Sequence, residues 1–268
     1  MFEYFGSSVA FATLPFAGAC RALADCGFDE VDIWSTSNWC EHLPPDQPAL
    51  DIAAVQAMLT ANRLHCQAIS VYGNPWDICA ARLEQLAALG GTALVRGAER
   101  GIDVATFAER LRPVADRARD LGVTLAIENH LDTCIDTTAS MIELVERIDH
   151  PGLGIALAPI HIYRLNEDVA AAIRALGNRI ALFYAWDWGP TAETNWKDPH
   201  EQIPGRGKID FPPIFRALHD IGYPRKLCLF AHGLEHQPVL EAQKMIREGV
   251  RFCQECDRSA NGSYDART

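Results

Sequence analysis

One glutamate and two histidines lie at the ends of apolar segments of the sequence or directly after them, and these residue types can transfer protons. Glu128 ends the segment "LAIE", His130 follows two residues later, and His161 follows "GIALAPI". A carboxylate at the buried end of such a segment needs a cation, a hydrogen-bond donor or a raised pKa, because burial disfavours its charge. Histidine changes charge near neutral pH without help. These residues suggest general acid–base chemistry, although a glutamate paired with an arginine for stability is an alternative.

Large aromatic side chains gather in the same parts of the sequence. All six tryptophans lie at the ends of apolar segments or shortly after them, and none lies inside an expected helix: Trp34, Trp39, Trp76, Trp186, Trp188 and Trp196. Aromatic rings can stack on a sugar or another ring, but they can also simply close the end of a core. We predict an aromatic-walled substrate site that includes Trp34, Tyr72, Trp186 and Trp188.

Eight short apolar segments are expected to be β-strands, with helical patterns between them. The strands are expected at residues 3–8, 30–34, 66–72, 92–97, 123–129, 153–158, 179–186 and 226–232. Amphipathic stretches such as 52–64, 77–90, 104–122 and 139–148 are expected to be helices. Strict alternation calls for parallel strands, and eight such units close into a barrel of about 250 residues. We predict one α/β domain, a single (βα)8 TIM barrel over residues 1–256, and a polar, frayed tail at 257–268.

The predicted barrel would bring the ends of all eight strands, and the residues there, to the same end of the molecule. Functional groups of such barrels lie at the C-terminal ends of the strands and in the loops that follow. These positions carry Trp34, Tyr72, Arg96, Glu128, His130, His161, Tyr184, Asp187 and His232. Arg96 could bind a carboxylate or phosphate group of a substrate.

Composition argues against several classes of function. The net charge is −11, from 24 basic and 35 acidic residues, whereas nucleic-acid binding needs a basic face. The segment "MFEYFGSSVAF" has no basic start and no long apolar run, so we expect neither a signal peptide nor a membrane span. Nine scattered cysteines fit reduced thiols. We expect a cytoplasmic protein that acts on a small molecule and could form a homo-oligomer.

Five motifs, in order along the chain, resemble one enzyme family. The motifs "IENH", "GIALAPIH", "ALFYAWD", "IPGRGKIDF" and "GYPRKLCLF" together resemble the sugar phosphate isomerase/epimerase family with the xylose-isomerase-like TIM barrel. The resemblance covers most of the chain, and "IPGRGKIDF" is its most specific motif. It implies a reaction that moves a proton next to a carbonyl, as isomerases, epimerases and dehydratases do. Arg206, within that motif, could reach the pocket or a substrate phosphate.

The metal centre that the resemblance implies is mostly missing from this sequence. Such proteins usually bind one divalent ion (Mn, Mg, Co or Zn) through a glutamate, an aspartate, a histidine and a second glutamate at four strand ends. Glu128 matches the first position, but Ala158, Tyr184 and Phe230 stand at the other three. Methyl and phenyl groups cannot coordinate a hard cation, and a neutral tyrosine coordinates one poorly. We therefore expect no metal cofactor.

Three functions remain open. The first is a metal-independent isomerase, epimerase or lyase that acts on a sugar-like or ring-containing molecule. In it Glu128 is the base and Tyr184 steadies the developing oxyanion, while His161 and His232 move the second proton. Asp187, a retained outer partner in the resembling motif, completes the catalytic set. The second is a metal enzyme whose site is rebuilt from residues at the same end, and the third is a non-catalytic binder or partner subunit. We predict the first.

Overall fold

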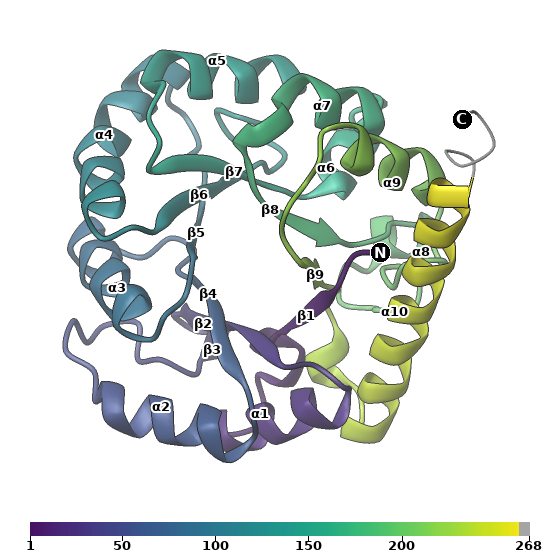
Figure 1. The fold of residues 1–268 in the computed structure, drawn as a ribbon, viewed down its shortest axis with the longest axis horizontal. Coiled ribbons are helices and arrows are strands. Elements are labelled where there is room, and N and C mark those ends of the chain that lie inside the picture. Colours follow the sequence, from purple (N-terminus) through teal and green to yellow (C-terminus); the bar gives the residue numbers. More distant parts are fainter. Residues whose placement is uncertain (263–268) are drawn as a thin grey trace.

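Eight parallel strands close into a barrel in the computed structural model, which describes residues 1–262 (Figure 1). The strands are β1 (Tyr4–Ser7), β2 (Glu30–Thr36), β4 (His65–Ser70), β5 (Ala93–Gly97), β6 (Thr124–Glu128), β7 (Leu153–Leu157), β8 (Ile180–Ala185) and β9 (Leu227–Leu229). Closure is complete because β1 pairs in parallel with both β2 and β9. The strands are nearly continuous apolar runs because the barrel core covers one face and the helices cover the other. The predicted (βα)8 barrel is confirmed.

A ring of helices surrounds the barrel (Figure 1). The main helices are α1 (Phe16–Asp25), α2 (Ile52–Ala61), α3 (Trp76–Ala88), α4 (Val104–Asp120), α5 (Thr138–Ile148), α7 (Val169–Leu176), α9 (Phe211–Asp220) and α10 (Val239–Gly262). Several begin at a side chain that accepts a hydrogen bond from the first turn: Asp51, Asp103, Thr137 and Asp168. Such caps satisfy backbone amides that have no partner inside the helix. They fix where each helix starts relative to the strand before it.

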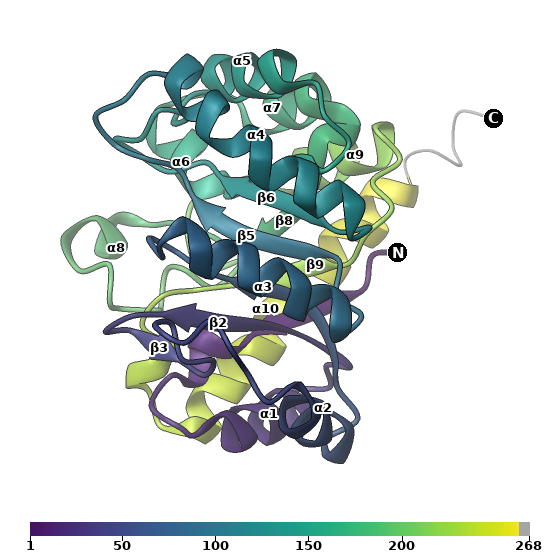
Figure 2. The ribbon, with the colours of Figure 1, turned by 90° about the vertical axis from the view of Figure 1, so that its left-hand side faces the viewer.

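Three short elements at the C-terminal ends of the strands were not predicted. They are β3 (Cys40–Glu41), which pairs antiparallel with the end of β2, α6 (Pro159–Arg164) and α8 (Pro190–Thr194). In Figure 2, β3 and α8 lie on the left, away from the N-terminus on the right. His161, which follows the strand, was expected in a loop, but it lies in α6. Pro159 starts that helix because its fixed φ suits the first helical position.

The last helix of the barrel extends past the expected boundary at residue 256. Helix α10 runs without interruption to Gly262, and residues 263–268 lie outside the described part of the chain. Asp257 is fully buried, and its carboxylate accepts the backbone N–H of Phe2 at 2.6 Å and contacts His219 Nε2 at 2.5 Å. A polar composition was therefore a misleading guide here, because the polar residue is paired and not solvated.

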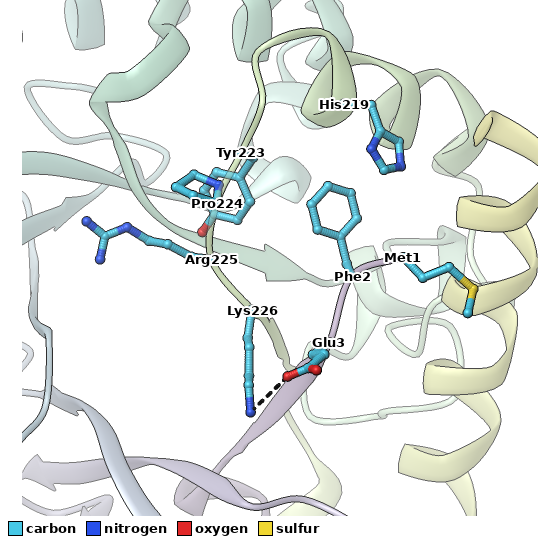
Figure 3. Close-up of a pocket in the computed structure, with 8 residues that line it drawn as sticks. All are labelled: Met1, Phe2, Glu3, His219, Tyr223, Pro224, Arg225 and Lys226. Atoms are coloured by element: carbon cyan, nitrogen blue, oxygen red, sulfur yellow. Dashed lines mark ion pairs between the residues drawn. The ribbon is translucent and has the colours of Figure 1, made fainter. Parts of the chain in front are cut away.

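A depression of about 380 Å³ lies at the N-terminal ends of the strands (Figure 3). Its side chains engage one another: Phe2 stacks on His219 with ring centroids 4.7 Å apart, and Lys226 Nζ lies 3.2 Å from Glu3 Oε2. In such barrels this end supports stability, and the opposite end carries function. None of the described helices is long and apolar enough to cross a membrane.

Close packing of α4 on the start of β7 gives a direct test of the fold. A Cβ added at Gly152 would lie 2.2 Å from the carbonyl oxygen of Ala115 and 2.8 Å from the backbone N of Arg119. We expect Gly152→Ala to lower the free energy of unfolding by about 2 kcal/mol, because backbone must move to make room. Chemical denaturation followed by circular dichroism measures it.

The matched control is Gly18→Ala in α1, where the nearest atom to a new Cβ is Leu14 Cβ at 3.3 Å. Only a side chain has to shift there, by a few tenths of an ångström, so this variant should lose far less stability than Gly152→Ala. Equal losses in both variants would contradict the described packing.

Candidate active site

A cavity of about 420 Å³ opens at the C-terminal ends of the strands. It is lined by Trp39, Arg100, His130, Ile160, His161, Arg164, Trp186, Trp188, Ala192, Glu193, Trp196 and His232. Five of the predicted site residues are thus brought together: His130, His161, Trp186, Trp188 and His232. The others lie beneath the cavity or away from it.

Glu128 and His161 form a buried pair in which His161 lines the cavity and Glu128 lies beneath it. Glu128 is the last residue of β6, and its Oε1 lies 3.9 Å from Nε2 of His161, which is beyond hydrogen-bond distance. Burial raises the pKa of Glu128 well above its ordinary value, and the charge of nearby Asp32 adds to this. Burial also lowers the pKa of His161 well below its ordinary value. The environment therefore favours a neutral carboxyl beside a neutral imidazole, not an ion pair.

His161 is held in place but its ring is left free. Neither of its ring nitrogens has a hydrogen-bond partner in the part of the chain that the structure describes. Its helix is fixed by Asn129, whose side chain accepts the N–H of Ala158 at 2.7 Å and donates to its carbonyl at 3.1 Å. A buried polar atom without a partner is costly, so these nitrogens are suited to meet a ligand.

Asp32, which sequence reasoning missed, is the second buried carboxyl of the barrel interior. It is fully buried and accepts hydrogen bonds of 2.8 Å from Ser7 Oγ, Ser70 Oγ and Trp34 Nε1. Burial raises its pKa to about 6, and these three donors oppose the rise. The signal in the sequence was an aspartate in the middle of the apolar strand "EVDIW".

The hydrogen bond to Asp32 also corrects the predicted role of Trp34. Its indole is buried and packs against the rings of Tyr72 (5.0 Å between centroids) and Phe230 (5.9 Å). Trp34 and Tyr72 are therefore part of the layer beneath the cavity and do not line it. A tryptophan that donates to a buried aspartate is fixed by that bond and supports the floor.

Tyr184 lies in the same buried layer. Its hydroxyl is 3.2 Å from that of Tyr72, and its ring packs edge-on against Phe230. Burial raises the pKa of Tyr184 well above its ordinary value, and the charges of Glu128 and Asp32 act in the same direction. The phenol therefore stays protonated, as a hydrogen-bond donor must. Its catalytic role stays a prediction.

Histidine and tryptophan rings form one wall of the cavity. Trp186 packs edge-on against His161 (5.8 Å between centroids) and His232 (4.8 Å). Gln202, fully buried, accepts from Trp186 Nε1 at 3.1 Å and from the N–H of His232 at 3.3 Å. Burial lowers the pKa of His232 to about 3, so this imidazole is neutral at physiological pH. His130 stacks near His161, with centroids 4.1 Å apart.

Asp187 does not fit the catalytic role predicted for it. Its two carboxylate oxygens accept four backbone N–H groups, those of Trp188, Gly205, Gly207 and Ile209, at 2.8 to 3.0 Å. A Cβ at Gly207 would lie 2.3 Å from Oδ1 of Asp187, which explains the glycine in "IPGRGKIDF". Asp187 therefore holds the loop that carries the tryptophan wall.

Two predicted substrate-binding arginines point elsewhere. Arg96 donates to the carbonyl of Asn74 at 2.6 Å, and its guanidinium lies 3.9 Å from the centre of the Trp76 ring. Arg206 pairs with Glu248. Neither lines the cavity, and both corrections have the same cause: a nearer partner outside the site satisfies the guanidinium.

The site does not fit the metal that the resemblance implies. Ala158 and Phe230 offer no donor atom, and the Tyr184 hydroxyl is a protonated phenol beside Tyr72. Within the described residues no group of three or more His, Cys, Asp or Glu side chains is arranged to hold a metal ion. Glu128 remains as the one matching ligand.

Comparison with known proteins places the chain in a family. A family model described as xylose isomerase-like TIM barrel matches residues 20–256. The chain belongs to this family. An inosose dehydratase of Lacticaseibacillus casei is 27% identical over 169 residues, which cover 55% of this chain and 56% of that protein. A D-psicose 3-epimerase of Ruminiclostridium cellulolyticum is 30% identical over 118 residues, which cover 43% of this chain and 36% of that protein.

Solved structures that are similar to this one share its fold. An L-ribulose 3-epimerase superposes with a TM-score of 0.75 at 19% identity, covering 99% of this chain and 97% of its own. A structure described as IOLI protein with a bound zinc atom gives a TM-score of 0.77 at 16% identity, covering 95% and 99%. The chain spans about half the length of the inosose dehydratases it matches. The matched curated relatives are enzymes, either dehydratases or epimerases.

The buried carboxyl of Asp32 predicts a specific pH dependence of stability. Its folded pKa of about 6 is above the ordinary value of 3.8, so the folded protein holds this proton more tightly than the unfolded chain. The resulting stability is present below about pH 4 and is lost as the pH rises through about 6. Between pH 4 and 7, wild-type stability should fall relative to Asp32→Asn by about 3 kcal/mol. Urea denaturation at several pH values measures it.

Asp46→Asn, at an exposed position, is the control and should give a profile parallel to that of the wild type. Parallel profiles for the wild type and Asp32→Asn would contradict a buried carboxyl of raised pKa.

Proposed function

We propose that this protein is a metal-independent isomerase, epimerase or dehydratase that removes a proton next to a carbonyl of a sugar-like molecule. The observation that carries the proposal is the Glu128 carboxyl beside the free imidazole of His161, which lines an indole-walled cavity. The relatives named inosose dehydratase and D-psicose 3-epimerase support the reaction class. Both reactions can begin with the same proton abstraction.

Glu128 takes the proton in this proposal. Its ionised form accepts the proton from the carbon next to the carbonyl, and the electron pair moves onto the carbonyl oxygen to give an enolate. The raised pKa makes Glu128 a stronger base than an exposed carboxylate, at the cost of a smaller ionised fraction at neutral pH. A carboxyl group with a raised pKa can both accept a proton and give it back near neutral pH.

Tyr184 and the histidines complete the reaction. Tyr184 lies in the layer beneath the cavity, close enough to Glu128 for that charge to raise its pKa, so its phenol is the proposed donor to the enolate oxygen. His161, neutral with both ring nitrogens free, relays the proton that Glu128 has taken up: it accepts that proton at one ring nitrogen as it gives the proton on the other to carbon, in an isomerisation or epimerisation. In a dehydration the same relay carries the proton from Glu128 to the leaving hydroxyl, which departs as water, and Glu128 is ionised again. His232 is the second neutral imidazole at the wall and serves the same transfer.

The tryptophans hold the body of the substrate. Trp186 and Trp188 present buried indoles to the cavity, while Trp39 and Trp196 at its rim are 36% and 45% exposed. Such rings pack on the apolar faces of sugars and exclude water. All nine cysteines are free thiols, which supports our proposal that the enzyme works in the cytoplasm.

A non-catalytic binder is the second candidate. The observation in its favour is that Ala158 and Phe230 remove donors from two of the four ligand positions of the family, and Tyr184 from a third. A binder and an enzyme differ in whether Glu128 is needed for turnover or only for shape. The following experiment separates them.

Replacing Glu128 by Gln removes the base and keeps the shape of the side chain. We expect exchange of the proton next to the carbonyl to slow by about 10² to 10⁴-fold, because one general base contributes about that much. The measurement is deuterium incorporation from D2O, followed by NMR, with inosose, D-psicose and L-ribulose as probes. Affinity for the substrate that exchanges should change little.

The matched control is Glu235→Gln. Glu235 is also a buried glutamate near the end of the last strand, but its partner is His236, at 3.7 Å, and not His161. It should keep nearly full exchange. Equal rates for the wild type and Glu128→Gln would contradict the proposal, as would unchanged binding with no exchange in either protein, which is the result for a binder.

A further inference from the structure

The rim of the cavity is positively charged although the chain is acidic. Its ionised side chains are Arg100, Arg164 and Glu193, while burial lowers the pKa of each of its histidines, His130, His161 and His232, and favours the neutral imidazole. The whole chain carries a net charge of −11. A local excess of positive charge in such a protein indicates a ligand of opposite sign.

The charge of Arg164 is balanced within the protein. Its Nε and Nη2 donate to the two carboxylate oxygens of Glu193 at 2.9 and 3.0 Å. Its guanidinium also lies over the Trp188 ring, 4.6 Å from the centroid, and Trp188 Nε1 donates to Glu193 at 2.5 Å. This network fixes Arg164 at the rim and ties α8 to α6.

The charge of Arg100 is not balanced. Its side chain lies at the cavity, yet it makes no ion pair with any residue that the structure describes. The nearest acid in the sequence, Glu99, is already held by Arg96 at 3.5 Å and by Arg110 at 2.5 Å. Arg100 therefore presents a guanidinium without an acidic partner to the space where the substrate would lie.

The two arginines share a neighbour. Both guanidinium groups lie close enough to His130 to lower the pKa of that imidazole, after the larger effect of burial. His130 in turn stacks near His161, which adjoins Glu128. The positive rim is thus next to the proposed reaction centre, and one small molecule can reach both.

We propose that Arg100 forms an anion subsite, flanked by Arg164, that binds a carboxylate or phosphate group of the substrate. The rest of the substrate then extends across His130 to Glu128 and His161. The guanidinium fork matches both kinds of anion, because it offers parallel N–H donors to two oxygens. This inference rests on the proposed function and narrows it to an acidic sugar derivative or a sugar phosphate.

The test compares three ligands that share a sugar body: D-glucose, D-glucuronate and D-glucose 6-phosphate. Isothermal titration calorimetry with the wild type should show at least one charged ligand binding about tenfold more tightly than D-glucose. The stronger of the two charged ligands tells carboxylate from phosphate. Arg100→Gln should remove the preference, and added salt should weaken it in the wild type.

Arg117→Gln is the matched control, because Arg117 pairs with Glu84 on the outside of the barrel. It removes the same charge and should keep the preference. Glu128→Gln should also keep it, since the subsite does not depend on proton transfer, so the subsite and the proposed chemistry can fail separately. The subsite is wrong if neither charged ligand binds more tightly than D-glucose, or if the preference survives in Arg100→Gln.

Discussion

The burial of Glu128 without a cation is the constraint on which the site depends. A carboxyl group at the end of a barrel strand has few ways to stay ionised: a metal, an arginine or several donors. Here the environment contains Asp32, whose charge raises the pKa further, and His161, whose own pKa is lowered by burial. The outcome is a pair of neutral groups that can exchange a proton with a ligand. In the proposed function, Tyr184 and the imidazoles are the hydrogen-bond donors and proton carriers that act with this pair.

The rest of the barrel mouth keeps this pair in place with buried polar groups that are themselves satisfied. The Asn129 side chain forms hydrogen bonds with both the N–H and the carbonyl of Ala158. These bonds fix the start of α6 and therefore the position of His161. Asp187 gathers four amides of the loop after β8, and Gln202 joins that loop to Trp186 and His232. Each of these groups would be costly if left alone, and each is paired with backbone. His161, which lines the cavity, keeps both ring nitrogens without a hydrogen-bond partner among the described residues.

Regular alternation let the sequence predict the eight strands and their closure, because strand and helix patterns are local. Barrel topology then brought His130, His161, Trp186, Trp188 and His232 to one cavity, as expected. The same reasoning could not separate the cavity wall from the layer beneath it.

Errors arose where the partner of a side chain comes from a distant part of the sequence. The Trp34 indole donates a hydrogen bond to Asp32 and does not line the cavity. Asp32 also accepts hydrogen bonds from Ser7 and Ser70, which lie on two other strands. Arg96 donates to the carbonyl of Asn74 and does not reach the cavity. The exposed Arg100, four residues later and in none of the motifs, lines the cavity instead. Tertiary packing decides which group pairs with each of these side chains, and a local sequence pattern does not show that choice.

The most direct test of the account is the metal content of the active protein. We predict that protein purified without added metal and then treated with chelator contains far less than one divalent ion per chain by elemental analysis. It should still exchange the substrate proton at the rate of the untreated protein. One transition-metal ion per chain, whose removal abolishes exchange and whose return restores it, would contradict the account.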